Sequence, residues 1–229
     1  MKYLFLMVSL ISGFAFSQNL EFDYYLKYKS SRIKPSEMKF EDAQIYINSK
    51  DPSYTMRSRI VGNQKRVDIE NFKTRFWYKF DVVHREGLSD VYYYDYARKF
   101  IDMDEKDKHF VSKVSVEKTG ENTYFIKTFK KGKKPNFEIR LELEKAEDDL
   151  LFMDIPDMSR DVSMKILSEL KNKLGEEKFV IKKVEYDYKT GFVFVSELLK
   201  IEKVSKRVNL PAEIHERAKM QFSASERQK

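Results

Sequence analysis

The chain of 229 residues contains no cysteine, only seven glycines and only five prolines. Without cysteine it cannot form a disulfide, a thiolate nucleophile or a cysteine-ligated metal site, so its stability depends on packing alone. The few glycines leave no glycine-rich loop of the kind that surrounds phosphate groups. These absences exclude several common classes of catalytic and cofactor-binding site.

Long apolar runs are equally scarce, and the one at the N-terminus is informative. It covers residues 3–16, follows Lys2 and is shorter than the roughly 20 residues that a membrane-spanning helix needs. Ala15-Phe16-Ser17 places small residues where signal peptidase cleaves. We therefore predict a signal peptide over residues 1–17, a mature chain beginning at Gln18 and a periplasmic or secreted location. Because no cysteine follows the cleavage site, we expect no lipid anchor.

The composition predicts a folded domain with a charged surface. Apolar residues make up 41% of the chain and aromatic residues 14%, and a chain this rich in aromatic residues is not expected to be disordered. Charged residues make up 35%, which is too many for a membrane-embedded protein. The formal net charge is +7. For an exported protein this charge favours anionic lipid head groups, acidic polysaccharide or acidic proteins as partners and not nucleic acid. Both signs are nevertheless interspersed along most expected strands, as on an ordinary solvated surface.

Apolar and polar residues alternate with period two along most of the chain, which predicts strands with one buried face. The first strand buries every second residue from Leu20 to Tyr28, and Phe137–Glu144 has the clearest alternation. Glycine- and asparagine-containing turns separate the segments, without helices between most of them, which indicates an antiparallel meander. The expected strands cover residues 20–28, 42–47, 54–61, 64–70, 75–82, 90–96, 110–117, 123–129, 137–144, 178–188 and 192–204.

One segment follows a helical period instead. Over residues 157–174, apolar side chains including Val162, Ile166 and Leu170 recur at helical spacing, between Pro156 and Gly175. The sequence therefore predicts a mainly β fold, in which a strongly curved antiparallel sheet or half-open barrel carries one amphipathic helix packed on its apolar face. A closed barrel with the helix outside is the alternative.

We expect a single β-rich domain over residues 18–212. No linker, proline-rich spacer or internal repeat divides the chain. The tail at residues 213–229 is expected to be partly ordered, with a short helix at most.

No arrangement of reactive residues in the sequence predicts catalysis. His84, His109 and His215 are scattered, and no second ligand stands at metal-binding spacing from any of them. Residues 102–107 resemble a calcium loop but lack its glycine at the sixth position and its terminal glutamate, so a charged turn is the simpler interpretation. A nucleophile elbow is also absent. We therefore predict a non-enzymatic protein without metal or cofactor; a hydrolase whose groups meet only in the folded chain is the least favoured alternative.

Two groups of residues are candidates for binding. An apolar groove under the sheet would hold a lipid or other hydrophobic ligand through buried area and would need no motif. The same side chains would equally form a filled core, in which case the protein is a structural or interaction module of the cell envelope. The candidate lining residues are Phe76, Tyr78, Phe80, Phe137, Ile139, Leu141, Phe192 and Phe194.

The second group consists of residues expected on the surface. Trp77 and Tyr93 lie in aromatic runs that occupy both faces of neighbouring strands. One of these two residues, or both, would therefore be exposed and could bind another envelope protein. The alternative is that both pack against aromatic side chains of the neighbouring strand. One predicted hairpin tip carries four lysines, Lys130, Lys131, Lys133 and Lys134. These lysines could bind an anionic membrane surface, or they could only increase solubility.

The order of these elements resembles that of periplasmic proteins similar to the LolA lipoprotein carrier. The residues that carry the resemblance are the strand Asn19–Tyr25 directly after the signal peptide, the segment Tyr92–Asp102, and the helix that precedes the last two strands. Small secreted envelope proteins of the GLPGLI type begin similarly, but their namesake motif is absent. The LolA resemblance implies a half-barrel with a concave apolar cavity for acyl chains, and no catalytic residue.

Overall fold

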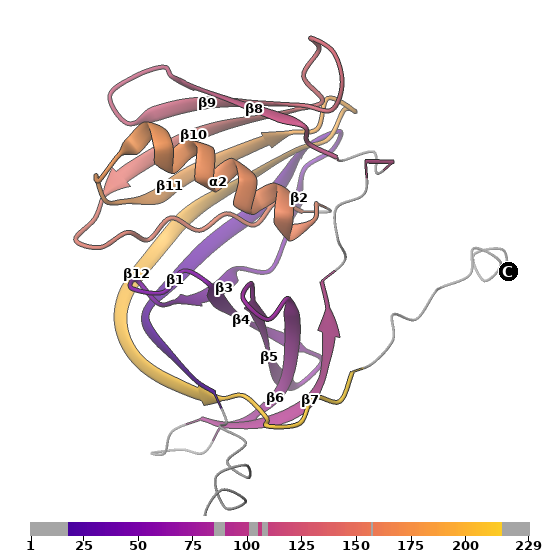
Figure 1. Cartoon of the computed structure of the whole chain (residues 1–229), viewed down its shortest axis with the longest axis vertical. Coiled ribbons are helices and arrows are strands. Elements are labelled where there is room, and N and C mark those ends of the chain that lie inside the picture. Colours follow the sequence, from indigo (N-terminus) through magenta and orange to yellow (C-terminus); the bar gives the residue numbers. More distant parts are fainter. Residues whose placement is uncertain (1–17, 85–89, 101–104, 107–109, 157, 217–229) are drawn as a thin grey trace, which may run out of the picture.

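The computed structural model describes residues 18–84, 90–100, 105–106, 110–156 and 158–216 (Figure 1). The predicted signal peptide at residues 1–17 lies outside these ranges. The described chain is mainly β, with twelve strands and one helix, labelled α2. The elements are β1 Asn19–Lys34, β2 Met38–Lys39, β3 Ala43–Ile47, β4 Tyr54–Val61, β5 Gln64–Asn71, β6 Phe76–Val83, β7 Val91–Lys99, β8 Lys113–Lys118, β9 Thr123–Phe129, β10 Phe137–Lys145, α2 Arg160–Leu174, β11 Phe179–Asp187 and β12 Val193–Asn209.

All strands belong to one antiparallel sheet with β1 and β12 at its centre. Its order is β7-β6-β5-β4-β3-β1-β12-β11-β10-β9-β8, with β2 paired to β1. Strands β1 and β12 have 16 and 17 residues, and their pairing contains three register shifts, at which bulges bend and twist the strands. Within the described residues the sheet does not close, because β7 and β8 remain its two edges. The predicted strongly curved open sheet is therefore confirmed, and the alternative closed barrel is wrong.

The period-two alternation predicted the strands well. Both β4 and β9 have the predicted bounds, and Leu20, Phe22, Tyr24, Leu26 and Tyr28 of β1 are all buried. Sequence reasoning underestimated β1 and β12, which continue to Lys34 and Asn209. Their bulges interrupt the alternation, so the pattern loses its phase before the strand ends.

Helix α2 begins three residues later than predicted. Ser159 is its N-cap, and Gly175 ends it with a left-handed backbone, φ +66°, donating its N–H to the carbonyl of Lys171 at 3.0 Å. The predicted contact of Val162, Ile166 and Leu170 with the sheet is confirmed, because all three are buried in one cluster with strands β9 to β11.

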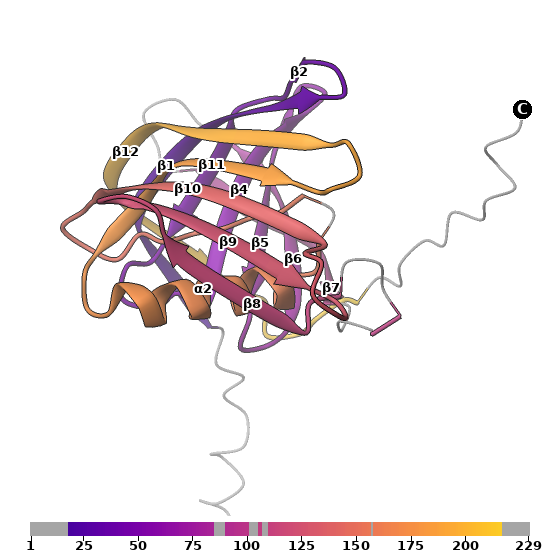
Figure 2. The same ribbon diagram turned by 90° about the horizontal axis from the view of Figure 1, so that it is seen from above.

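Each half of the sheet has its own core. In the C-terminal half, β9, β10 and β11 pack against α2 and the segment Leu150–Pro156. In the N-terminal half, strands β4 to β7 pack against the first residues of β1 and the last residues of β12. A smaller cluster around Leu26, Ile45 and Val180 connects the two. Figure 2 shows α2 across the strands of the C-terminal half.

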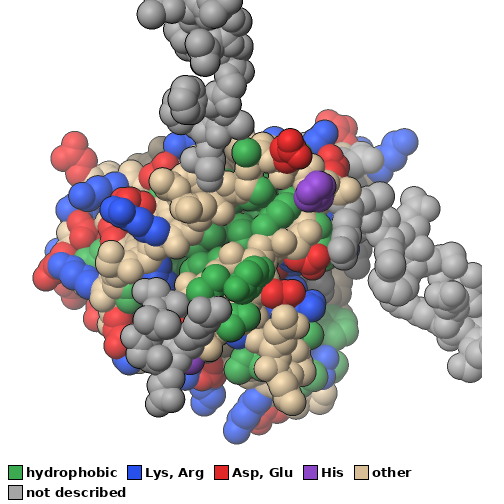
Figure 3. Space-filling model, turned by 90° about the horizontal axis from the view of Figure 1, so that it is seen from below, with side chains coloured by type: hydrophobic (Ala, Val, Ile, Leu, Met, Phe, Trp, Pro, Cys, Tyr) green, Lys and Arg blue, Asp and Glu red, His purple; other side chains and the backbone are tan. Residues whose placement is uncertain are grey.

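Among the residues described, the N-terminal half has no helix of its own. Seen from below, apolar side chains form a band in the middle of that face, bordered by charged side chains (Figure 3). Aromatic side chains at its core remain half-buried, among them Tyr25, Phe76, Tyr92 and Tyr94. This half therefore covers its apolar face by curling and not by a separate layer.

The described start of the predicted tail pairs with the sheet edge. Ala97 of β7 donates its N–H to the carbonyl of His215 at 2.9 Å, and Glu216 forms a parallel bridge with Ala97. Residues 217–229 lie outside the described ranges, so the helix considered for them is not addressed. In the part of the chain described, no helix is long and apolar enough to cross a membrane.

Candidate functional site

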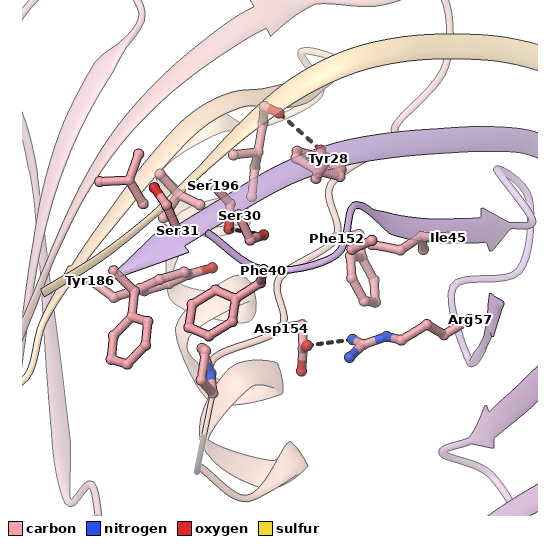
Figure 4. Close-up of a pocket in the computed structure, with 16 residues that line it drawn as sticks. Tyr28, Ser30, Ser31, Phe40, Ile45, Arg57, Phe152, Asp154, Tyr186 and Ser196 are labelled. Carbon is pink, nitrogen blue, oxygen red and sulfur yellow. Dashed lines mark hydrogen bonds and ion pairs between the residues drawn. The ribbon is translucent and has the colours of Figure 1, made fainter. Parts of the chain in front are cut away.

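A cavity of about 370 Å³ lies between the centre of the sheet and the segment that connects β10 to α2 (Figure 4). Its walls come from β1, β3, β4, β11 and β12 on the sheet side and from Phe152, Asp154 and Pro156 on the other. Most of the lining is apolar. The remaining lining residues are Tyr28, Ser30, Ser31, Phe40, Ala43, Ile45, Arg57, Ile181, Val184, Tyr186, Phe194, Val195 and Ser196.

Aromatic side chains form the rim of this cavity. Phe40, which follows β2, stacks on Phe194 of β12 with ring centroids 6.0 Å apart, and its side chain is 39% exposed. Tyr188 packs edge-on against Phe194 from the β11–β12 turn. Phe40 and Phe194, which line the cavity at this end, are therefore partly in solvent, whereas Tyr188 behind them is buried.

The few polar groups in the cavity are ordered. Tyr28 donates its hydroxyl to the carbonyl of Ile181 at 2.9 Å, and the hydroxyls of Ser30 and Ser196 are 2.8 Å apart. Burial raises the pKa of Tyr186 well above its ordinary value. The Tyr186 hydroxyl points into the cavity in Figure 4. A small polar group of a ligand could bond there.

A network of buried charges closes the far side of the cavity. Asp154 accepts bonds from Arg57 of β4 and from Arg160 at the start of α2, and Arg160 also binds Glu70 of β5. The side chains of Arg160 and Glu70 are only 11% and 5% exposed. The network thereby ties α2 to the N-terminal half of the sheet, because buried charges are tolerated only when paired.

The two carboxyl groups respond differently to this environment. Burial raises the pKa of Glu70, and its arginine neighbours do not fully offset that effect. Burial also acts to raise the pKa of Asp154, but the guanidinium groups of Arg57 and Arg160 outweigh it and hold that pKa below the ordinary range. Asp154 is thus the fixed anion of the network.

A second cavity, of about 440 Å³, lies on the other side of the same segment. It is bounded by the ends of β3 to β5 and by the face of α2 that carries Arg160, Ser163 and Leu167. Phe152 lines both cavities. The segment between β10 and α2 therefore divides the space under the sheet into two chambers.

The structure places the predicted lining residues in three different environments. Tyr78 and Phe80 are buried in the core of the N-terminal half, with Phe76 packed beside them, and Phe137, Ile139 and Leu141 are buried in the core of the C-terminal half. None of these six lines either cavity described above. Phe192 is 42% exposed in the β11–β12 turn, and only Phe194 lines a cavity.

The residues predicted for the surface are also divided. Trp77 is half-buried and packs edge-on against Phe100. Two cations lie near its ring: the guanidinium of Arg160 is 5.9 Å and the ammonium of Lys79 is 5.5 Å from the ring centroid. Tyr93 is 50% exposed on the edge strand β7. Lys131, Lys133 and Lys134 are exposed in the β9–β10 turn, whereas Lys130 is half-buried and donates to the carbonyl of Lys106 at 3.5 Å.

Sequence reasoning missed Tyr28, Arg57, Phe152 and Asp154 as cavity residues. A signal in the sequence could have indicated the segment that contains Phe152. Residues 150–153 are four successive apolar residues, Leu-Leu-Phe-Met, outside any predicted strand or helix, and a loop of that composition must be buried. Arg57 carries no such signal, because its position in β4 resembles that of any solvated strand residue.

Within the described ranges, no group of three or more histidine, aspartate or glutamate side chains could hold a metal ion. The Nδ1 atom of the exposed His84 lies 2.9 Å from Oδ1 of Asp90, and the ring of His215 stacks on that of Tyr94. His109 and most of the calcium-like segment 102–107 lie outside those ranges.

No known protein family and no curated protein matches this chain.

Proposed function

We propose that this protein is a non-enzymatic binding protein that holds the apolar chain of a lipid or another hydrophobic ligand between the curved sheet and the Leu150–Pro156 segment. The observation that carries the proposal is the cavity of about 370 Å³, whose walls are mostly apolar. Its volume lies in the range of roughly 300–1,000 Å³ that is typical of small-molecule sites.

The physical case rests on transfer of apolar surface out of water. Each methylene buried in such a cavity contributes about 0.8 kcal/mol, so an acyl chain gains affinity without any specific contact. The hydroxyl of Tyr186 and the Ser30–Ser196 pair offer hydrogen bonds to a single polar group. This combination suits an amphiphile with one small polar head better than it suits a plain hydrocarbon.

We further propose an exported, periplasmic or secreted location, supported by the signal-peptide pattern of residues 1–17. The half-barrel layout that resembles LolA-like carriers supports the same function, because those carriers shield acyl chains from water. N-terminal sequencing of the protein recovered from its native envelope tests the location, and a start at Gln18 is the expected result.

The binding proposal is tested by mass spectrometry of an organic extract of the folded protein purified from its native envelope. A stoichiometric apolar molecule, absent from a control protein handled identically, is expected. The variant Ala43→Phe places a ring in the cavity and should lose this molecule, whereas Leu199→Phe, on an exposed site of β12, should keep it.

Two results would overturn the proposal. One is an empty extract from folded protein that also fails to bind a fluorescent fatty-acid analogue. The other is equal ligand loss in the two variants. Either result favours the alternative, an interaction module of the cell envelope with a filled core, and a search for a protein partner would follow.

A further inference from the structure

Three turns of the chain meet at one end of the sheet. The pairing register places the start of β10 beside the end of β11, where Glu138 pairs with Asp187, and the end of β1 beside the start of β12, where Lys34 pairs with Val193. The β1–β2, β9–β10 and β11–β12 turns therefore lie side by side, on the right in Figure 2. We call this set of turns, residues 33–40, 130–136 and 188–192, the turn end.

Aromatic contacts hold the three turns together. Phe40 stacks on Phe194, Phe194 contacts Tyr188 at 5.5 Å, and Tyr188 contacts Phe137 at 4.9 Å between ring centroids. Lys189 binds both Asp187 and Glu138, which fixes the β11–β12 turn to β10. The turn end is therefore one continuous surface that adjoins the rim of the cavity.

Large apolar side chains stand in solvent on this surface. The exposed fractions of Ile33, Met38 and Phe192 are 42%, 48% and 42%, and Phe40 is 39% exposed. Single exposed apolar residues are common, but four on adjoining turn tips are characteristic of an interaction surface.

The same surface carries unpaired positive charge. Residues 130–136 contain four lysines and no acidic residue, and Lys131, Lys133 and Lys134 make no ion pair with any described residue. The β1–β2 turn adds Lys34 and Lys39 beside Glu37, so it is close to neutral. Positive charge therefore concentrates on the β9–β10 turn, next to the exposed apolar tips.

The opposite end of the same strands mixes both signs. There, the β8–β9 turn, the end of β10 and the residues after α2 expose five acidic side chains, Glu121, Glu144, Glu147, Glu176 and Glu177, beside the lysines Lys118, Lys145, Lys173 and Lys178. The β9–β10 turn has lysines without acidic neighbours, so it is the end of these strands that a negatively charged surface would attract.

We infer that the turn end docks on an anionic lipid bilayer, with its lysines at the head groups and the tips of Met38, Phe40 and Phe192 inserted at the interface. A flat array of negative charge over an apolar layer complements lysines interleaved with exposed apolar tips. Docking in this orientation brings the rim of the cavity to the membrane surface, although the docking itself does not require an occupied cavity.

The test is co-sedimentation of the mature protein with vesicles of phosphatidylcholine, with and without phosphatidylglycerol. Binding is expected only with phosphatidylglycerol and should weaken as salt rises. The variant Lys131→Gln, Lys133→Gln, Lys134→Gln should lower the partition coefficient by roughly 100-fold, since each lysine near an anionic surface contributes about 1 kcal/mol. Removing the same charge from the opposite end, with Lys118→Gln, Lys145→Gln, Lys173→Gln, should leave binding within about twofold of the unmodified protein.

A second pair of variants tests the apolar tips. Met38→Ser with Phe192→Ser should weaken vesicle binding roughly tenfold, whereas Leu199→Ser with Ile201→Ser, which are 52% and 37% exposed on β12, should not. Equal binding to both kinds of vesicle, or equal losses at the two ends, would overturn the inference. So would retention on a soluble acidic polysaccharide without any binding to vesicles. Because these measurements need no ligand, their failure is distinguishable from failure of the proposed binding function.

Discussion

The two halves of the sheet cover their apolar faces by different means. Strands β9 to β11 lie under α2 and the Leu150–Pro156 segment, which supply a separate layer. Strands β4 to β7 have no such layer in the part of the chain that the structure describes, and they curl around the ends of β1 and β12. The comparison shows why the cavity forms where it does. The cavity lies where the separate layer of one half meets the curled strands of the other, between Phe152 and the centre of the sheet.

The two halves also differ in what they contribute to the contact between them. The C-terminal half contributes Asp154 and Arg160, and the N-terminal half contributes Arg57 and Glu70. A polar network at this contact fixes the position of α2 more sharply than apolar packing alone would, because each buried charge requires its partner at hydrogen-bond distance.

The largest effect is expected from breaking this network. Arg160→Ala leaves the buried Glu70 and the half-buried Asp154 with fewer partners, and removing one partner of a buried ion pair costs about 3–5 kcal/mol. Urea denaturation measures this loss. A double variant, Arg160→Met with Glu70→Leu, should recover a substantial part of it, because the charge of Glu70 is removed together with its partner.

If Arg160→Ala unfolds no more easily than the unmodified protein, the network does not hold the halves together. Arg140→Ala is the matched control, since Arg140 pairs with Glu185 on an exposed part of the sheet. Its loss should cost at most about 1 kcal/mol.

A smaller loss of stability is expected when a buried side chain of helix α2 is shortened. Ile166 of α2 is fully buried against the C-terminal half, so Ile166→Ala should cost about 2–4 kcal/mol through lost burial and the cavity that remains. Met164→Ala, on the exposed side of the same helix, should cost less than about 1 kcal/mol.

Hydrogen exchange of the Ile166→Ala variant sharpens the comparison. Protection should fall more in β9 to β11 than in β4 to β7, if each half depends on its own cover. Equal loss of protection across the whole sheet would show that the halves unfold as one unit.

The smallest effect concerns the pH dependence of stability. Burial raises the folded-state pKa of Glu70 above its ordinary value of 4.5. Between pH 4.5 and this raised pKa, the unfolded chain has already released the Glu70 proton, whereas the folded chain still holds it. The free energy of unfolding therefore falls as pH rises through this range. Asp154 acts in the opposite direction, since its lowered pKa makes its contribution disappear as pH falls.

Glu70→Gln isolates this contribution. The free energy of unfolding, measured by urea denaturation at a series of pH values, should fall less with rising pH above 4.5 in the variant than in the unmodified protein. Identical pH profiles would mean that Glu70 titrates normally in the folded chain.

The sequence alone determined the local structure. Alternation fixes which face of each strand is buried, since side chains point to opposite faces at successive residues, and it predicted β4, β9 and the buried face of β1 correctly. Helical spacing between Pro156 and Gly175 likewise predicted α2 and its buried face. These features depend on neighbours within a few residues of one another.

Only the tertiary structure decided which apolar residues fill a core and which line a cavity. Phe137 and Phe194 have the same pattern in the sequence, yet Phe137 is fully buried in a packed cluster and Phe194 lines the cavity, because bulges in β1 and β12 set the curvature of the sheet. The pairing of Arg57 and Glu70 with Arg160 and Asp154, and the meeting of three turns at one end, depend on the same curvature. The Arg57–Asp154 and Glu70–Arg160 bonds join residues 97 and 90 positions apart, and such contacts arise from the register of the whole sheet, which no local pattern encodes.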